Sequence, residues 1–213
     1  QLNYRKSTGK FNYNFGFNLG TQSSVLSSVP SEFFGPSVNE GLQSVNIFRE
    51  GEAPGAFYGF KVTDVYDDQA QIDSDPFREF DPNRGVLSPG DFVKEDVAGP
   101  VDDNGNPTGP DGIVDGNDLQ ILGSPVPDFT YGFNFNGSYG KLDFGLLFNG
   151  VQGNEIYNQA RAFNTFFADG NKLSDVTDRW TPTNTSGSLP RAVGSTDTGN
   201  NAVPSSFFVE DGS

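Results

Sequence analysis

Acidic and amide side chains of the types and spacing that could bind a cation gather in one stretch of the chain. Between Pro89 and Pro127 the sequence is crowded with Asp, Asn and Gly. Carboxylate and amide oxygens at short intervals, with a Gly where the chain bends, are what Ca²⁺ and other hard cations require. The same residues also cap turns, because Asp and Asn side chains accept hydrogen bonds from nearby backbone N–H groups. The stretch therefore has two interpretations, a cation site or a self-capped loop.

Catalysis by these acids is disfavoured by where they lie. A hydrolase with paired carboxylates needs a carboxyl group whose pKa is raised by apolar surroundings. Asp143 is the one acid inside an apolar stretch, and alternation places it on the polar side of a predicted strand. The chain has no Cys and no His, which excludes disulfides, thiol catalysis, His-based metal sites and Ser–His triads. The net charge of −15 disfavours nucleic acid as a partner, so we expect neither an enzyme nor a nucleic-acid-binding protein.

Three stretches alternate strictly between two kinds of residue, which is the signal of β-strands. One kind is aromatic or aliphatic, and the other is mostly small and uncharged. The first kind comprises Phe11, Tyr13, Phe15, Phe17, Leu19, Phe129, Tyr131, Phe133, Phe135, Leu142, Phe144, Leu146 and Phe148. An aromatic side opposite Asn and Gly is typical of a strand that has lipid on one side and a wet pore on the other. The alternative is an edge strand of a soluble sheet.

Short and long connections alternate between the predicted strands. The strands lie near 10–28, 128–137 and 140–150, with short turns at Ser7 and Ser138 and long loops over 29–127 and 153–213. Outer-membrane barrels have short periplasmic turns and long outer loops, so we expect both loops to be extracellular. Within the second loop, the spacing of apolar residues predicts a short helix over 154–165 and a helical turn over 175–180.

A series of short motifs resembles the C-terminal third of SusC-like TonB-dependent outer-membrane transporters. In chain order the motifs are GEAPGAFYGF, PGD, DGIVDGND, ILGSPVPDFTYGF, NEIYNQAR, RWTP, LPR and the final EDGS. In that family the acidic loop is similar to the calcium loops of EF-hands and dockerins. The resemblance thus implies calcium ligands, which are Asp96, Asp111, Asp115 and Asp118. Ala98, where an Asn ligand is usual, and the inserted residues 100–110 depart from the family pattern.

The resemblance also implies a fold, a function and partners. The fold is all-β, an antiparallel segment of a transmembrane barrel of about 22 strands with long loops and one or two short loop helices. The function is import of glycans or peptides across an outer membrane, energised through TonB and assisted by a SusD-like surface lipoprotein. The plug domain, the part that TonB engages and the final barrel strands are expected outside these 213 residues.

Four aromatic residues of the loops are candidates for contact with substrate or partner. They are Phe57, Tyr58, Tyr157 and Trp180. The alternative for each is packing inside the loops, as an anchor that holds a long connection together. A second class of protein also stays open on the sequence alone. It is a secreted calcium-binding β module that binds carbohydrate at the cell surface, and the acidic loop and the exposed aromatic residues would suit it too.

Overall fold

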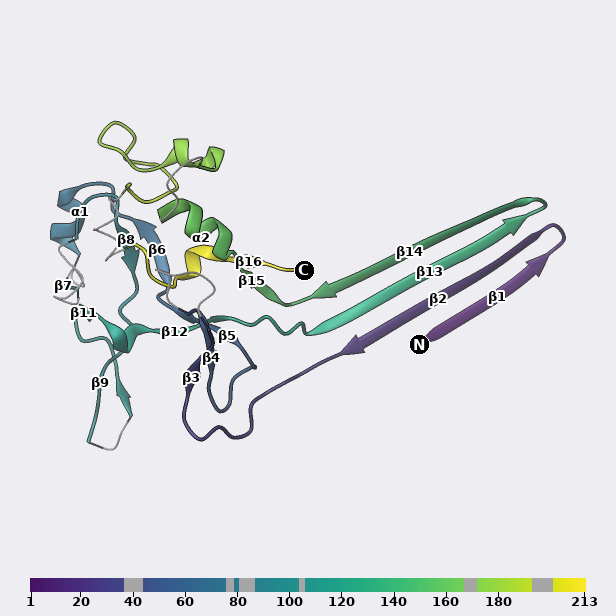
Figure 1. Ribbon diagram of the computed structural model, residues 1–213, viewed down its shortest axis with the longest axis horizontal. Helices are drawn as coiled ribbons and strands as arrows, with labels where there is room; N and C mark the ends of the chain where they lie inside the picture. The colour runs from purple at the N-terminus through teal and green to yellow at the C-terminus, as the bar shows by residue number, and fades with distance from the viewer. Residues whose placement is uncertain (37–43, 76–78, 81–86, 104–105, 167–171, 193–200) are drawn as a thin grey trace.

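The computed structural model describes the chain except for residues 37–43, 76–78, 81–86, 104–105, 167–171 and 193–200 (Figure 1). A long four-stranded sheet projects like an arm from a body of short strands and helices. The strands of the arm are β1 (Leu2–Thr8), β2 (Phe11–Thr21), β13 (Phe129–Tyr139) and β14 (Leu142–Gln152). They lie in the order β1-β2-β13-β14, and all neighbours are antiparallel. The predicted all-β antiparallel fold is confirmed.

Each hairpin of the arm turns at a Gly-Lys pair, which is Gly9-Lys10 in the first hairpin and Gly140-Lys141 in the second. Gly9 and Gly140 have φ of +62° and +63°, and no residue other than Gly has a positive φ in the described chain. A two-residue turn with Gly first is of the II′ kind, whose twist matches that of the flanking strands. The sequence predicted longer turns around Ser7 and Ser138, but both serines lie within strands. A two-residue turn is sufficient, and so pairing continues to Thr8 and Tyr139.

The body is built from small sheets supplied by the two long connections. One has four strands in the order β12-β5-β4-β3: β12 is Gln120–Gly123, β5 is Ala56–Gly59, β4 is Asn46–Phe48 and β3 is Phe33–Phe34. The two-stranded sheets are β6 (Val62–Val65) with β8 (Phe92–Lys94), β9 (Gly99–Val101) with β10 (Pro107–Thr108), the parallel pair β7 (Glu79–Phe80) with β11 (Ile113–Val114), and β15 (Glu155–Tyr157) with β16 (Val209–Asp211). The body therefore contains more β-structure than the sequence indicated.

Helices are few and short. In the described parts of the chain they are α1 (Gln69–Ser74), α2 (Gln159–Phe166) and three 3₁₀ turns, Gly116–Asp118, Ser174–Asp178 and Ser206–Phe208. The helix predicted over 154–165 begins later than expected, because residues 155–157 pair with β16 instead of coiling. The helical turn predicted over 175–180 is the 3₁₀ turn at 174–178. Among the described residues, no helix is long and apolar enough to cross a membrane.

The buried core lies in the body and not in the arm. Phe60, Val114 and Val203 form its hydrophobic cluster, and Phe92 and Phe208 are also almost completely buried. In contrast, many large apolar side chains of the arm are exposed, including Leu19, Leu142 and Phe148 at 55%, 64% and 57%. A monomeric soluble protein rarely exposes so large a contiguous apolar surface, which marks a face that another phase or molecule covers.

Candidate functional site

The register of the arm sorts its side chains onto two faces of different chemistry. We call one the aromatic face. It carries Leu2, Tyr4, Phe11, Tyr13, Phe15, Phe17, Leu19, Phe129, Tyr131, Phe133, Phe135, Tyr139, Leu142, Phe144, Leu146 and Phe148, together with Gly137 and Gly150 and, toward its ends, Lys6, Thr8, Thr21 and Gln152. Residues that pair across antiparallel strands share a face, so the alternation that was visible within each strand is continued across all four.

Rings on the aromatic face touch one another from strand to strand. Phe133 of β13 lies 5.0 Å from Phe15 of β2 and 6.0 Å from Phe148 of β14 between ring centroids. Where a Gly occurs on this face, a neighbouring ring covers it. A Cβ on Gly137 would lie 2.3 Å from Phe144, and one on Gly150 would lie 2.3 Å from Tyr131. The glycines therefore make room for rings and keep the face continuous, a known way of fixing strand register.

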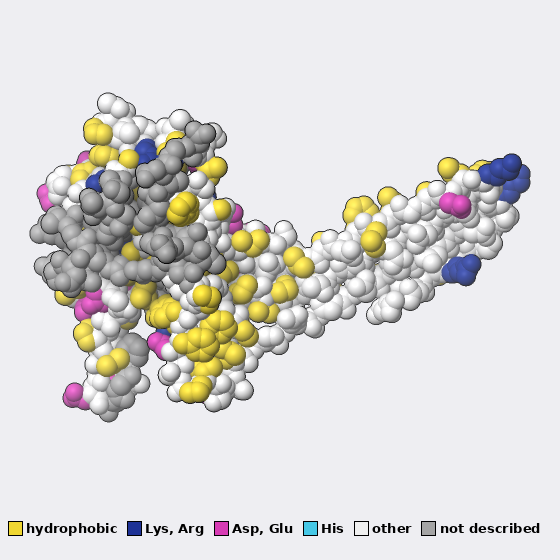
Figure 2. Space-filling model, viewed as in Figure 1, with side chains coloured by type: hydrophobic (Ala, Val, Ile, Leu, Met, Phe, Trp, Pro, Cys, Tyr) yellow, Lys and Arg dark blue, Asp and Glu magenta, His cyan; other side chains and the backbone are white. Residues whose placement is uncertain are grey.

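The opposite face, which we call the polar face, consists mainly of amides and glycines. It carries Asn3, Arg5, Ser7, Asn12, Asn14, Gly16, Asn18, Gly20, Thr130, Gly132, Asn134, Asn136, Ser138, Asp143, Gly145, Leu147, Asn149 and Val151. Gly16 and Gly132 are covered by the amides of Asn134 and Asn18, as rings cover glycines on the other side. In Figure 2 the arm turns mostly polar side chains and backbone to the viewer, with basic residues at its far end.

The dimensions of the arm match those of a transmembrane sheet. Its three long strands have 11 residues each. Such a strand is about 36 Å long at roughly 3.3 Å per residue. At the usual tilt of about 35–45° it covers the roughly 25 Å apolar band of an outer-membrane barrel. One hydrocarbon-like face and one hydrated face are what a barrel wall between lipid and an aqueous interior requires.

In the acidic loop, the carboxylate of Asp118 accepts hydrogen bonds from backbone N–H groups of the loop itself. Asp118 is fully buried, and its Oδ1 accepts hydrogen bonds from the backbone N–H groups of Val97 (2.8 Å) and Ala98 (3.1 Å). Its Oδ2 accepts from the N–H of Asp115 (2.7 Å), whose own side chain accepts from Asn117 (2.7 Å). These bonds form a capping box around one 3₁₀ turn. Burial, together with the nearby charge of Asp96, raises the pKa of Asp118.

The other two predicted ligands, Asp96 and Asp111, accept fewer hydrogen bonds. Asp96 is 6% exposed, and its Oδ2 accepts from the N–H of Gly112 (2.8 Å). Its Oδ1 is buried without a hydrogen-bond partner. Asp111 is exposed and accepts from the N–H of Ile113 (3.0 Å). In the described residues no group of three or more acidic side chains is placed to hold a metal ion. The geometry is that of a self-capped loop, in which Asp96 Oδ1 is the one buried oxygen of the four carboxylates still open to a cation.

Three of the four predicted contact aromatics lie in the body, two of them in contact with each other. Phe57 is buried and its ring lies 6.0 Å from that of Tyr157. Burial raises the pKa of Tyr157 to about 12. Tyr58 is half-buried, with the guanidinium of Arg49 4.7 Å above its ring and the ring of Phe34 5.9 Å away. Phe57 and Tyr157 thus pack inside the body, and Tyr58 takes part in a cluster nearer its surface.

The fourth, Trp180, anchors a junction of distant segments. Its indole N–H donates to the carbonyl of Asp67 (2.9 Å). Its ring lies against Gly90, where an added Cβ would come within 2.7 Å of the indole and 2.6 Å of Arg191. The N–H of Gly90 donates to the carbonyl of Tyr66, and the N–H of Arg191 donates to that of Gly90, both at 2.7 Å. These contacts favour the packing interpretation of Trp180.

The same junction contains a buried ionic network that sequence reasoning did not assign. Asp91 is fully buried, and its Oδ1 accepts from Arg191 Nε (2.6 Å) and Asn201 Nδ2 (2.9 Å). Its Oδ2 accepts from the N–H of Ser88 (2.9 Å), and Asn201 Oδ1 accepts from the N–H of Phe92 (2.9 Å). The motifs PGD and LPR were the available signal, because they supply Asp91 and Arg191. Nothing in the sequence indicates that they meet.

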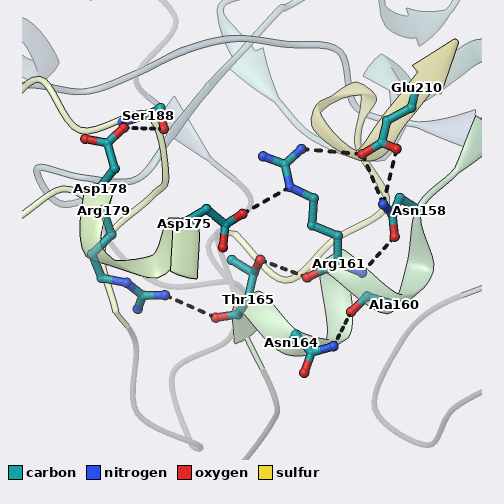
Figure 3. A network of polar contacts seen from close by, with 10 residues as sticks. All are labelled: Asn158, Ala160, Arg161, Asn164, Thr165, Asp175, Asp178, Arg179, Ser188 and Glu210. Carbon is teal, nitrogen blue, oxygen red and sulfur yellow. Dashed lines mark hydrogen bonds and ion pairs between the residues drawn. The ribbon is translucent and has the colours of Figure 1, made fainter. Parts of the chain in front are cut away.

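A second polar network ties α2 to the end of the chain (Figure 3). The guanidinium of Arg161 lies between Asp175 (3.6 Å) and Glu210 (3.7 Å), and 5.1 Å from the ring of Phe207. The side-chain amide of Asn158 donates to Glu210, and its oxygen accepts from the N–H of Arg161. These are structural bonds of partly exposed groups, and they hold the second long connection together.

Comparison with known proteins points to one class. The chain is 36% identical over 210 residues to TonB-dependent receptor P26 of Formosa agariphila, which covers 97% of the chain. It is 29% identical over 195 residues to TonB-dependent receptor P3 of the same organism, which covers 89% of it. No protein-family model matches the chain.

Solved structures agree on the fold. Structures of the RagAB peptide transporter and of the RagAB peptide importer in its "closed-closed" state match 98% of the chain and 20% of their own, with TM-scores of 0.61 and 0.60 and 17% identity. At that identity the likeness shows the fold alone. The two-faced antiparallel sheet thus has the fold of one segment of the RagAB structures. The chain belongs to the TonB-dependent receptors, and it spans about a fifth of the length of the relatives it matches, 19% and 18%.

Proposed function

We propose that the chain forms part of the wall and outer loops of an outer-membrane importer of glycans or peptides that is energised through TonB. The observation that carries this proposal is the division of the arm into an aromatic face and a polar face across four strands in register. The aromatic face contacts outer-membrane lipid and the polar face lines the water-filled interior. The relatives are named as receptors and the structural neighbours as transporters, which supports transport over catalysis.

A SusD-like surface lipoprotein and the TonB complex are the proposed partners. The structural neighbours are the RagAB peptide transporter and importer, and the paired letters of that name support a partner of this kind. The lipoprotein would meet the body, since the proposal places the body outside the membrane. Purification of the full-length receptor from outer membranes tests this. We expect one lipoprotein to co-purify with it in equal amount, and isolation of the receptor alone after mild extraction would contradict the partnership.

The orientation of the arm gives a further test. The chain has no Cys, so single cysteines can be introduced and labelled. Asp103 and Lys141 are both exposed, the first in the body and the second in a hairpin turn. In intact cells we expect a membrane-impermeant maleimide to label Asp103→Cys in the full-length receptor. Lys141→Cys should react only after the outer membrane is opened. The reverse pattern would contradict the proposed orientation.

Calcium binding by the acidic loop stays a proposal, supported by two features. Asp96 Oδ1 is buried and without a hydrogen-bond partner, and neither Asp96 nor Asp118 pairs with a Lys or Arg among the described residues. Two buried carboxylates close together need a proton or a cation to offset their charge. Asp96, Asp111, Asp115 and Asp118 would hold the ion. No other cofactor is proposed.

Calorimetric titration of the intact protein with Ca²⁺ tests that site. Extracellular calcium modules bind with dissociation constants of roughly 0.1–1 mM, so the titration must reach millimolar concentrations. We expect Asp96→Asn to weaken binding about tenfold or more, because it removes one charged ligand and little volume. Asp103→Asn, which changes the net charge equally at an exposed position, should leave binding unchanged. If no heat is released, or if both variants bind Ca²⁺ with equal affinity, the proposed calcium site is wrong.

A further inference from the structure

The two ends of the arm differ in charge, and the end at the hairpin turns is basic. The arm contains four of the 13 basic residues of the chain and one of its 28 acids. Figure 2 shows basic side chains at the far end of the arm. The four residues lie in the two turns or in the rows next to them, and they are Arg5, Lys6, Lys10 and Lys141. The charge of the arm is thus positive and confined to one end, although the net charge of the chain is −15.

Three of these basic residues lie on the aromatic face or in the turns that end it. Lys6 belongs to the aromatic face, whereas its neighbour Arg5 belongs to the polar face. Lys10 and Lys141 are the second residues of the two turns. The turns lie side by side, because the backbone N–H of Gly140 donates to the carbonyl of Lys10 (3.2 Å). All three lysines are exposed, and together we call them the basic edge.

Tyrosines on the aromatic face lie near the basic edge. They are Tyr4, Tyr13 and Tyr139, of which Tyr4 and Tyr139 are 50% and 59% exposed. The ring of Tyr13 lies 6.1 Å from that of Tyr4 and 5.3 Å from that of Phe11 between centroids. Tyr is enriched where a membrane meets water, because its ring is apolar and its hydroxyl group is polar. Rings with hydroxyl groups beside ammonium groups indicate the level at which hydrocarbon gives way to lipid headgroups.

The position of Lys6 along its strand fits the depth of the lipid phosphates. One row of the aromatic face has no polar side-chain atom and so marks the middle of the apolar band, and it consists of Leu2, Phe17, Phe133 and Phe148. Lys6 is four residues from Leu2 on β1, which is about 13 Å at roughly 3.3 Å per residue. At a tilt of about 35–45° this is about 10 Å along the membrane normal, and half of the roughly 25 Å apolar band is about 12 Å. The flexible stem of a Lys at this depth lets its ammonium group reach the phosphates.

The rest of the receptor leaves the aromatic face uncovered. A plug occupies the interior of a transporter barrel, and so it lies on the side of the polar face. Neighbouring strands pair with the outer edges of β1 and β14 and extend the sheet sideways, without covering either of its faces. Under the proposed function, lipid is therefore what covers the aromatic face and reaches its basic edge.

We propose that the basic edge binds the phosphate groups of phospholipids in the inner leaflet of the outer membrane, with a preference for phospholipids of net negative charge. The proposal rests on the proposed function, which places the aromatic face in lipid and the hairpin turns on the periplasmic side. Lys6 reaches the phosphates from the aromatic face, and Lys10 and Lys141 reach them from the turns. Because the acids of the chain lie almost entirely in the body, the attraction acts at one end only and holds the strands at a fixed depth.

Photo-crosslinking of the full-length receptor in lipid vesicles tests the proposal. The vesicles consist of phosphatidylcholine with a trace of phosphatidylglycerol that carries a photoreactive group at its head, and crosslinks to the arm are measured against those elsewhere on the receptor. We expect Lys6→Gln to reduce crosslinking to the arm about fivefold, which is the effect of one lysine near an anionic lipid surface. Adding Lys10→Gln and Lys141→Gln should reduce it further. The matched control is Arg5→Gln, which removes the same charge from the adjacent residue on the polar face and should crosslink like the parent protein.

Three outcomes would overturn the proposal. Equal losses in Lys6→Gln and Arg5→Gln would show an effect of total charge and not of the aromatic face. Unchanged crosslinking in Lys6→Gln would mean that an acid of a neighbouring strand or of another protein pairs with the lysine in place of lipid. Crosslinking of a photoreactive lipopolysaccharide that depends on Lys6, with none of phosphatidylglycerol, would place the turns in the outer leaflet. If cells then still accumulate peptides or glycans through the receptor, the import function stands and only the headgroup site falls.

Discussion

Replacing Leu146 by Arg is expected to destabilise the receptor in the membrane by about 2–4 kcal/mol, the cost of placing Arg on the lipid face of an outer-membrane barrel near the bilayer midplane. Leu146 pairs with Phe135, which pairs with Phe15, so it lies in the middle of the aromatic face. Its side chain is 53% exposed in the structure, and the proposed function covers it with hydrocarbon. The measurement is the unfolding midpoint of the full-length receptor in lipid vesicles, together with the amount of folded receptor in outer membranes.

Leu147 supplies a matched control one residue away. It is the same residue type on the same strand, 69% exposed, but it belongs to the polar face, where it pairs with Asn134. Leu147→Arg should therefore change the unfolding free energy by less than about 1 kcal/mol, because Arg remains in water there. A freestanding secreted module would leave both leucines in water and make both substitutions nearly neutral. Equal effects at the two positions would contradict the lipid contact and, with it, the import function.

The sequence predicted the arm because the arm follows local rules. Alternation of period two is decided within a strand, and so the aromatic and polar sets of β2, β13 and β14 could be read directly. The strand β1 was not predicted, since Arg5, Lys6 and Ser7 interrupt its alternation and resemble a turn. Its pairing with β2 follows from the two-residue turn at Gly9 and Lys10, and so from turn geometry rather than from apolar pattern.

The body was less predictable because its contacts join distant parts of the chain. Asp91 and Arg191 are 100 residues apart, and Asp91 and Asn201 are 110 apart. No periodicity connects such positions. The acidic loop shows the same limit on a smaller scale. The types and spacing of Asp96 and Asp118 fitted a cation site, whereas the structure uses most of their oxygens to bind backbone N–H groups within the loop. Composition cannot distinguish these uses of a carboxylate.

Replacing Gly90 by Ala is expected to open the junction of the body, because two independent costs add at this position. Gly90 has a φ of +87°, a conformation that costs an L-residue roughly 1–2 kcal/mol. The added methyl group would also lie 2.6 Å from the Cβ of Arg191 and 2.7 Å from the ring of Trp180. Forcing an extra methyl into a packed site costs about 1–3 kcal/mol more. We therefore expect a local loss of roughly 2–5 kcal/mol.

Gly51 isolates the backbone part of that cost. Its φ is +88°, and a Cβ there would meet nothing within 4 Å, so Gly51→Ala carries only the conformational penalty. Hydrogen exchange of the full-length receptor can compare the two variants through the backbone N–H of residue 90, which donates to the carbonyl of Tyr66, and the N–H of Arg191. Because each 1.4 kcal/mol changes exchange about tenfold, Gly90→Ala should accelerate exchange of the Arg191 amide by about thirtyfold or more. Gly51→Ala should leave it unchanged. Unaltered exchange at Arg191 in Gly90→Ala would mean that Trp180 and Arg191 yield freely, and the junction would then not be the anchor of the second long connection.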